Sequence, residues 1–227
     1  MKIAAISDMH GILDFNIEKS DVLFICGDIM PLSIQSYSKE SKKWFINTFI
    51  PWCKSLPVND IYLVGGNHDW WIYRHPEDVK KICQENMSNL HYLIDEEATY
   101  CDDCGNIFKI YGTPWCHQFG NWAFMGYSDE ALSKIFMNMP DDVDFLITHD
   151  APYGVSDICN SFWNAGTHIG NHGLAAAIVL KQPKYNFHGH LHTSNHSCEM
   201  LEKTKVYNVS MINEEYELQY YPLYLEI

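Results

Sequence analysis

Five short polar segments stand directly behind strand-like runs in this chain of 227 residues, and they constrain its fold more than any other feature. Four of them follow apolar runs rich in β-branched residues, and the last follows residues 185–188. The segments are Asp8-Met9-His10, Gly27-Asp28, Gly66-Asn67-His68-Asp69, Thr148-His149 and Gly189-His190-Leu191-His192. Polar groups placed just past the carboxyl ends of successive strands converge on one edge of an open α/β sheet. The order of the segments therefore predicts one polar site built from distant parts of the chain.

The rest of the chain mixes helices with strands. Strands are expected at residues 2–7, 21–26, 61–64, 143–148, 185–188, 205–209 and 217–226, and short hairpins at 90–111. Helical spacing covers residues 36–54, a helix opens at Pro76, and further helices are expected at 128–139 and 173–181. Pro51 is expected to kink or end the first helix. This succession favours a mixed α/β sandwich over a pure doubly wound sheet.

The composition is that of one globular domain, which we expect to span residues 1–227. Hydrophobic residues make up 47% of the chain, and no linker or repeat divides it. An uninterrupted apolar run of ~18 residues, which a membrane span needs, is absent from the sequence. A cleavable leader would remove the segment that begins at Asp8, so we expect a mature, cytoplasmic protein.

The formal charge of −14 disfavours binding to nucleic-acid backbone, which requires clustered Lys and Arg. Arg74 is the only arginine in the chain, and arginine is the residue that normally clamps phosphate with two hydrogen bonds. Any phosphate bound here is therefore expected to be held mainly by metal ions, histidine and asparagine. The expected partner is a small molecule.

The polar segments have the chemistry of a metal site. Asp8 and His10 are separated by one residue, which puts both side chains on the same side of an extended chain, and the second histidine pair repeats this spacing. The Asp28 carboxylate has two oxygens that can each meet a different ion. Mixed ligation by Asp, Asn and His suits Mn, Fe, Zn or Co. Each segment alone is typical of an ordinary polar turn, but together they predict metal ligation.

The segments resemble the pattern of the calcineurin-like metallophosphoesterase family, which reads D-x-H, G-D, G-N-H-D/E, H and G-H-x-H, over residues 8–192. Residues 111–115, 119–124 and 206–210 resemble the small metallophosphoesterase-domain phosphodiesterases within it. The resemblance implies an α/β fold in which a β-sandwich of mixed sheets is flanked by helices, giving four αββα layers.

The resemblance also implies two divalent ions, manganese first and Fe, Zn, Co or Ni as alternatives. One ion would be held by Asp8, His10, Asp28 and His192, and the other by Asp28, Asn67, His149 and His190. A hydroxide between ions that are typically ~3.5–4 Å apart would attack phosphorus in line. His68 matches the family's leaving-group histidine and would act as general acid. Asp69 would orient His68 and keep it cationic, and Asn67 would stabilise charge on the phosphoryl oxygens.

Candidate substrate contacts lie near these segments. Trp70 and Trp71 would either stack on a nucleobase or aryl group, or pack against the adjacent helix. Arg74 is a candidate contact to phosphate. His168 and His172 would reach the substrate, unless Asn171 only caps the helix that follows. His188 is expected to support a ligand or to pack in the core, whereas no pattern separates the remaining histidines from surface residues: His75, His91, His117 and His196.

Eight cysteines in a chain without an export sequence are expected to be reduced. Cys101 and Cys104 have the spacing of a zinc site, which Cys116 and His117 would complete. A lone pair of this kind is weak evidence, so we favour a solvent-facing turn.

The leading hypothesis is a binuclear phosphodiesterase that hydrolyses small phosphodiesters or cyclic nucleotides. The alternatives are a phosphomonoesterase or protein phosphatase, and a non-catalytic metal-binding scaffold on the same fold. A protein phosphatase is disfavoured because enzymes of that kind carry an arginine soon after the second aspartate, where this chain has Ile29, Met30 and Pro31. A scaffold is disfavoured because no ligand position of the pattern is missing.

Overall fold

The protein, seen in a computed structural model, is described over residues 1–160 and 165–227. Its strands are β1 (Lys2–Ile6), β2 (Ser20–Cys26), β3 (Val58–Val64), β4 (Leu90–Tyr92), β5 (Glu96–Cys101), β6 (Ile107–Thr113), β7 (Phe145–Thr148), β8 (Ile158–Cys159), β9 (Thr167–His168), β10 (Tyr185–His188), β11 (Glu199–Leu201), β12 (Thr204–Asn208) and β13 (Leu223–Glu226). Its helices are α1 (Ser38–Trp44), the π-helical turn η1 (Phe45–Phe49), α2 (Ile50–Ser55), α3 (Trp70–Arg74), α4 (Pro76–Asn86), α5 (Asp129–Phe136) and α6 (His172–Lys181).

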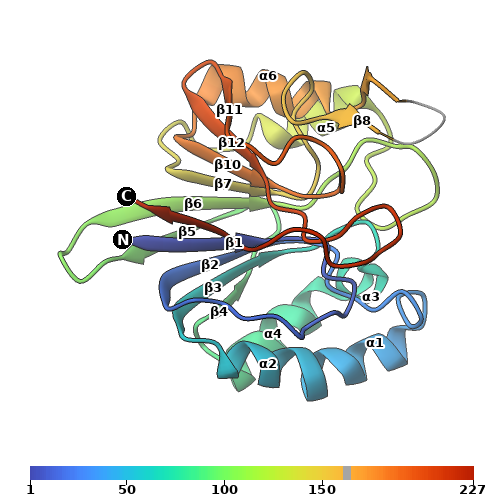
Figure 1. Ribbon diagram of the computed structural model, residues 1–227, viewed down its shortest axis with the longest axis vertical. Coiled ribbons are helices and arrows are strands. Elements are labelled where there is room, and N and C mark those ends of the chain that lie inside the picture. The colour runs from blue at the N-terminus through green and yellow to red at the C-terminus, as the bar shows by residue number, and fades with distance from the viewer. Residues whose placement is uncertain (161–164) are drawn as a thin grey trace.

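Two sheets face each other at the centre of the molecule, and helices cover the outer face of each (Figure 1). The first sheet has the strand order β13-β1-β2-β3-β4 and is covered by α1 to α4. The second has the order β11-β12-β10-β7-β6-β5 and is covered by α5 and α6. A small pair, β8-β9, stands apart from both sheets. The predicted αββα sandwich of mixed sheets is confirmed.

Strand β2 shows why the layers form. Val22, Phe24 and Cys26 belong to the core between the sheets, whereas Leu23 and Ile25 belong to the core under the helices. Alternate side chains of a strand point to opposite faces, so a strand that is apolar throughout must be covered on both sides. The Phe24 ring meets two rings of the second sheet, Phe145 and Phe187, at centroid distances of 5.4 and 5.3 Å.

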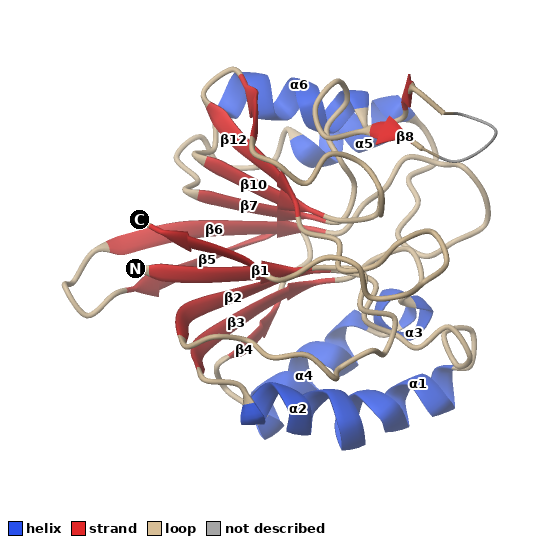
Figure 2. Ribbon diagram, in the orientation of Figure 1, coloured by secondary structure: helices blue, strands red, loops and turns tan. Residues whose placement is uncertain are grey.

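The directions of the strands place the polar segments together. Strands β1 to β4 run parallel within the first sheet, and β6, β7, β10 and β12 run parallel within the second. Their carboxyl ends lie on the same side of the sandwich, opposite the two chain termini (Figure 2). The five polar segments follow β1, β2, β3, β7 and β10. They therefore meet at one edge, as the sequence predicts.

The helix does not end at Pro51, one of the two outcomes expected there, because it continues from α1 through η1 and α2 to Ser55. The N–H of Ile50 donates to the carbonyl of Phe45, five residues earlier. This π turn shifts the hydrogen-bond ladder directly before Pro51, which then lies in the first turn of α2, where a missing N–H costs little. In the described part of the chain, no helix has the length and apolar character that crossing a bilayer requires.

The expected strand over residues 217–226 is much shorter, because β13 comprises only Leu223–Glu226. A loop takes the preceding residues, and Asn213 organises it: the Asn213 side-chain oxygen accepts hydrogen bonds from the backbone N–H groups of Glu215 and Glu217, each at 3.0 Å. Tyr216, inside this loop, has φ of 62°, the left-handed conformation. The loop reaches back to the edge where the polar segments meet.

Candidate metal centre

Four candidate ligands have an uncommon backbone conformation. Asp8, His10, Asp28 and His190 have φ values of 55°, 43°, 52° and 68°. Non-glycine residues take this left-handed region rarely, although Asp and His do so more often than most. Such residues cost of order 1–3 kcal/mol each and cluster at functional sites. Here they turn the chain sharply after a strand, so that side chains from five segments face one another.

Two glycines allow this crowding. Gly27 has φ of 98°, and a Cβ there would lie 2.6 Å from the Nδ1 atom of His149. A Cβ on Gly189 would lie 2.2 Å from an Asp8 carboxylate oxygen. Both contacts are too short for real atoms, so the backbone must carry glycine at these positions for the candidate ligands to approach.

Replacing Gly189 by alanine is therefore expected to displace the Asp8 carboxylate and to lower metal affinity by about 10–100-fold, the range seen when a group supporting a metal site is lost. Titration calorimetry with Mn²⁺ or Zn²⁺ measures this. Gly105→Ala is the control for backbone strain without a clash, because φ there is 84° and a Cβ meets nothing within 4 Å. Unchanged affinity in Gly189→Ala would contradict the close approach.

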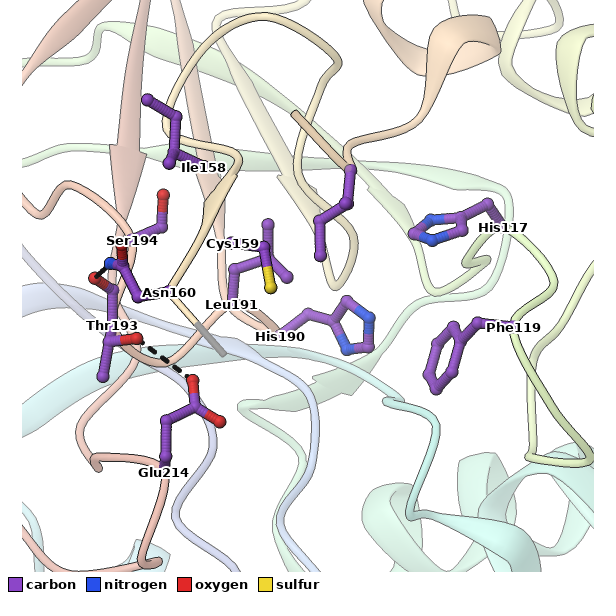
Figure 3. Close-up of a pocket in the computed structure, with 11 residues that line it drawn as sticks. His117, Phe119, Ile158, Cys159, Asn160, His190, Leu191, Thr193, Ser194 and Glu214 are labelled. Atoms are coloured by element: carbon purple, nitrogen blue, oxygen red, sulfur yellow. Dashed lines mark hydrogen bonds between the residues drawn. The ribbon is translucent and has the colours of Figure 1, made fainter. Parts of the chain in front are cut away.

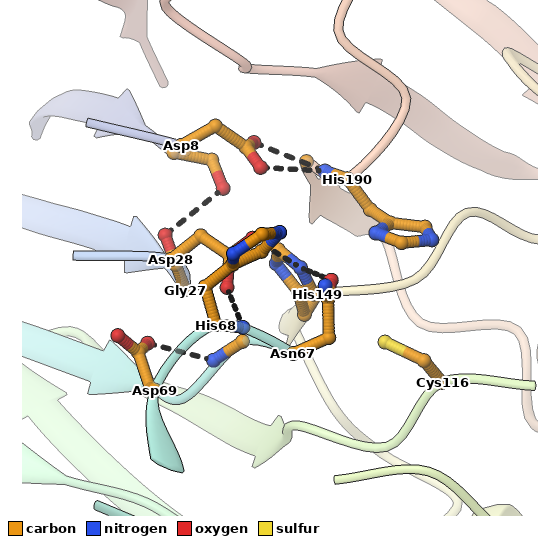
Figure 4. Close-up of polar contacts among 12 residues, drawn as sticks. Asp8, Gly27, Asp28, Asn67, His68, Asp69, Cys116, His149 and His190 are labelled. Atoms are coloured by element: carbon orange, nitrogen blue, oxygen red, sulfur yellow. Dashed lines mark hydrogen bonds and ion pairs between the residues drawn. The ribbon is translucent and has the colours of Figure 1, made fainter. Parts of the chain in front are cut away.

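Potential ligand atoms from distant segments lie close together (Figure 4). The atoms of three groups lie within 4.8 Å of one another in each group: Asp8, His10 and His192; Asp8, Asp28 and His149; and Cys116, His149 and His190. Asn67 joins the second and third groups, because its Oδ1 lies 2.9 Å from the Nε2 of His149. The structure thus brings together every residue that the sequence singled out as a metal ligand.

Asp28 lies at the centre of this arrangement. Its Oδ2 is 3.4 Å from the Nε2 of His149 and 3.7 Å from that of His10. Its Oδ1 accepts a hydrogen bond of 2.7 Å from the backbone N–H of His68. On the other side of the group, Asp8 Oδ1 lies 3.5 Å from the Nε2 of His192. Asp28 therefore faces side chains of both expected metal positions.

The donor set fits divalent cations. His10 is 7% exposed, yet neither of its ring nitrogens has a hydrogen-bond partner among the described residues. Unpartnered buried polar atoms are rare and call for an explanation such as an ion. Burial, opposed by the charges of Asp28 and Asp8, lowers the pKa of His10 to about 4. The imidazole is therefore neutral, the form that binds metals.

The electrostatics of Asp28 and His149 point the same way. Burial alone would lower the pKa of His149, but the carboxylates of Asp28 and Asp8 and the carbonyl of Cys26 together raise that pKa to about 10. The nearby His149 and His68 hold the pKa of Asp28 well below its usual range, despite its burial. Positive charge beside the buried Asp28 carboxylate is therefore favourable. A divalent ion would supply this charge in place of a proton on His149.

His68 lies beside the candidate ligands, with its Nε2 3.9 Å from the Oδ2 of Asp28. Its Nδ1 contacts the Oε1 of Gln35, and its ring packs against Trp122 at a centroid distance of 4.5 Å. Gln35 therefore orients the imidazole, a role that the sequence assigned to Asp69. Neither Gln35 nor Trp122 was singled out, although Trp122 belongs to a segment that resembles the family.

The expected contact between Asp69 and the His68 side chain is wrong. Within the described residues, the Asp69 carboxylate accepts from the backbone N–H groups of Gly66, Met30 and Ile29, at 2.9, 3.0 and 3.4 Å. Burial and the charge of Asp28 raise the pKa of Asp69 to about 7. The carboxylate ties the loop after β2 to the loop after β3, so it acts on the position of His68 through the backbone.

Two adjoining cavities open beside these residues. The first, of about 210 Å³, is lined by Asp28, Asn67, His68, Phe119, Trp122, His190, His192, Glu214 and Tyr216. The second, of about 290 Å³ (Figure 3), shares Phe119, His190 and Glu214 with it and adds His117, Ile158, Cys159, Asn160, Ile169, Leu191, Thr193 and Ser194. His117, considered from the sequence only for the disfavoured zinc site, donates its backbone N–H to the buried carboxylate of Asp150 and pairs with it through Nδ1, at 2.9 Å each.

The suggested substrate contacts lie elsewhere. Trp71 is 1% exposed and packs on Phe45 under the first sheet, so it is a core residue. Arg74 lies over the ring of Trp70 at 4.6 Å, and neither residue lines the two cavities. The aromatic lining comes instead from loops far along the chain, because α3 turns its rings toward the helical layer.

The two later histidines are also outside the cavities. His168 pairs with Asp157 at 2.5 Å, and the exposed ring of His172 stacks on Tyr153 at 3.7 Å. Asn171 caps α6 by accepting from the N–H of Leu174, as the alternative interpretation expected. His188 is buried, and burial lowers its pKa to about 4.

The Cys101 and Cys104 pair lies at the tip of the hairpin between β5 and β6. The Asp102 carboxylate accepts from the backbone N–H groups of Cys104 and Asn106, at 3.0 and 2.8 Å. These hydrogen bonds form the turn that the sequence analysis favoured over a zinc site. Cys116 does not join that pair, because it lies with His149 and His190. Cys26 is a buried residue of β2.

The αββα sandwich, with carboxylate, amide and imidazole groups gathered at its carboxyl edge, defines the class of protein as a metallophosphoesterase. The chain belongs to the calcineurin-like phosphoesterase family, whose model matches residues 1–194. The loop that carries Glu214 and Tyr216 lies beyond the matched region. Proteins of this family typically use two metal ions, and the candidate His and Asp groups agree with that.

Named relatives support this placement. The chain is 29% identical over 215 residues to the human metallophosphoesterase domain-containing protein 1, an alignment that covers 84% of this chain and 60% of the relative. It is 34% identical over 257 residues to a UPF0046 protein of Caenorhabditis elegans, covering 100% of this chain and 60% of that protein. The chain thus spans about 60% of the length of these curated relatives.

Solved structures share the fold at low identity. The phosphopantetheinyl hydrolase of Mycobacterium tuberculosis superposes with a TM-score of 0.60 at 11% identity, covering 95% of this chain and 90% of that one. A protein of Thermus thermophilus superposes with a TM-score of 0.58 at 15% identity, covering 91% and 88%. These likenesses establish the architecture.

Proposed function

We propose that this protein is a binuclear, metal-dependent phosphodiesterase that hydrolyses small phosphodiesters, cyclic nucleotides among them. The observation that carries the proposal is the buried group of carboxylate, amide and imidazole ligands at the wall of the 210 Å³ cavity, with His68 facing the same space. A mononuclear or purely structural site would not need Asp28 between two sets of ligands.

The first ion would be held by Asp8, His10, Asp28 and His192, and the second by Asp28, Asn67, His149 and His190. When bound, such ions polarise the phosphoryl oxygens and make a nucleophile available near neutral pH. The nitrogen and oxygen ligands named here suit manganese, iron, zinc or cobalt.

The chain's own residues orient the substrate and move the proton. Asn67 presents an uncharged amide beside the phosphoryl oxygens. His68, held by Gln35 and flanked by Trp122, donates a proton to the departing oxygen. Asp69 holds together the loops that carry Asp28 and His68, because its carboxylate accepts hydrogen bonds from backbone N–H groups of both loops.

The charge of the site favours diesters over monoesters. Neither cavity is lined by Lys or Arg among the described residues, and Glu214 adds a carboxylate to both. A phosphate monoester carries about −1.5 to −2 charges near pH 7, whereas a diester carries a single one. With no arginine to clamp a dianion, the singly charged diester is the better substrate.

The second cavity favours an organic leaving group. Phe119, Ile158, Ile169 and Leu191 give it an apolar side, while Thr193, Asn160 and Ser194 supply a few polar groups. Cavities of this mixed kind bind small organic ligands. A nucleoside or an aryl group fits this lining better than a second phosphate does.

Rates on bis-p-nitrophenyl phosphate and on p-nitrophenyl phosphate test the proposal. Both are measured with Mn²⁺, Zn²⁺ or Co²⁺ added to chelator-treated protein, and Asp28→Asn serves as the blank for contaminating phosphatases. Preferential, metal-restored hydrolysis of the diester is expected. A preference for the monoester would favour a phosphomonoesterase, and inactivity with every metal would favour the scaffold.

Glu214→Gln is expected to improve the binding of an anionic diester. Like charges a few ångströms apart in a hydrated cavity repel by about 1 kcal/mol, so KM should fall by about fivefold while kcat changes little. Glu215→Gln is the matched control, because this neighbouring carboxylate lines neither cavity. A KM that is the same in both variants would show that Glu214 does not face the substrate.

A further inference from the structure

Cys116 lies inside the candidate metal centre, although the ligand pattern of the family does not include this position. Its Sγ and the ring nitrogens of His149 and His190 lie within 4.8 Å of one another. Cys116 is 0% exposed. Figure 4 shows its side chain directed toward the part of the cluster that Asn67 and His149 occupy.

The backbone holds this thiol in place. The N–H of Cys116 donates to the carbonyl of Phe124 at 2.9 Å, and the Cys116 carbonyl accepts from the N–H of Gly126 at 3.0 Å. The hydrogen bond of the thiol itself, to the carbonyl of Pro114 at 3.8 Å, is long and weak. A bound ion could therefore recruit the sulfur without breaking a strong interaction.

The ring nitrogens of His190 are available to bind a metal ion. Its backbone N–H donates to the Asp8 carboxylate at 3.0 Å, but its ring nitrogens make no hydrogen bond to the described residues. The ring packs against His149 at a centroid distance of 5.1 Å.

We propose that the Cys116 thiolate is a ligand of the second metal position, together with His149 and His190. The proposal rests on the two-metal site proposed above. Ligation forms a metal–sulfur bond and releases the thiol proton to solvent. A thiolate favours zinc or cobalt over manganese, so the second position would select a softer metal than its oxygen and nitrogen donors alone imply.

Cobalt spectroscopy tests the ligand without reference to activity. Apo protein receives two equivalents of Co²⁺, and the absorption spectrum is recorded. A thiolate-to-cobalt charge-transfer band in the near ultraviolet is expected in the parent protein and should be lost in Cys116→Ser. Zinc affinity of this variant should fall by about 10–100-fold, and manganese affinity should fall less.

Two control variants address three of the seven other thiols. Cys83→Ala removes a buried thiol of α4, and the double variant Cys101→Ser, Cys104→Ser removes the exposed hairpin pair. Both should keep the charge-transfer band. Disappearance of the band in the double variant would place the sulfur ligand in the hairpin and overturn the proposal.

If Cys116→Ser fails to fold, the cobalt spectrum of the parent protein still tests the proposal. Visible d–d bands of two bound cobalt ions without a charge-transfer band would overturn the role of Cys116 and leave the two-metal site standing. Failure of the parent protein to bind cobalt, zinc or manganese would overturn the metal site itself.

Discussion

Replacing Asp28 by asparagine is expected to lower the occupancy of both metal positions and to reduce turnover by about 10³-fold. The Asp28 carboxylate is 1% exposed and faces His149 and His10 at 3.4 and 3.7 Å. Asparagine keeps the shape but removes the charge and one of the two oxygens. Loss of metal ions removes several kcal/mol of transition-state stabilisation, and each 1.36 kcal/mol is tenfold in rate.

Metal content by atomic emission and titration calorimetry measure this effect. Asp21→Asn is the matched control, since this carboxylate lies at the other end of β2, where it accepts from the backbone N–H of Lys2 at 2.6 Å. The circular dichroism of both variants should match the parent protein. An Asp28→Asn variant that retains two ions at parental affinity would contradict the bridging role.

His68→Ala is expected to leave the metal content intact and to slow the hydrolysis of diesters with poor leaving groups by about 10²–10⁴-fold, the usual contribution of a general acid. An alkoxide needs a proton as it departs, whereas a p-nitrophenolate leaves readily without one. The loss on an activated aryl diester should therefore be much smaller. The geometry supports this, because His68 lines the cavity beside Asp28 and is oriented by Gln35.

Rates on an alkyl and an aryl diester, compared at equal metal content, measure the contrast. His91→Ala is the control, since His91 pairs with Asp60 at 2.7 Å on another face and lines neither cavity. An equal loss on both substrates would rule out the acid role. A loss of bound metal would instead make His68 a ligand.

Much of the site was predictable because the relevant patterns are local. An apolar run followed at once by Asp, Asn or His shows both a buried strand and the polar group at its end. Because parallel strands end on the same edge, the convergence of Asp8, Asp28 and Asn67 followed from the sequence. The spacing of His190 and His192 is equally local. The mixed α/β sandwich followed from the succession of helices and strands along the chain, and the four αββα layers followed from the resemblance to the family.

The contacts that orient and line the site were not predictable in this way. Gln35 rather than Asp69 meets the ring of His68, because the Asp69 carboxylate is taken by backbone N–H groups of two loops. Trp122 rather than Trp71 stands beside that ring, because α3 turns Trp71 into the core.

The sequence by itself determined the order of the strands' polar ends, and its resemblance to the family implied the ligand set and the αββα class. Only the tertiary structure decided which residues surround that set: Gln35, Cys116, Trp122, Glu214 and Tyr216. They lie in loops whose course depends on left-handed turns and on packing between segments that are far apart in the sequence. Neither propensity nor periodicity encodes such contacts, because both describe only neighbours along the chain.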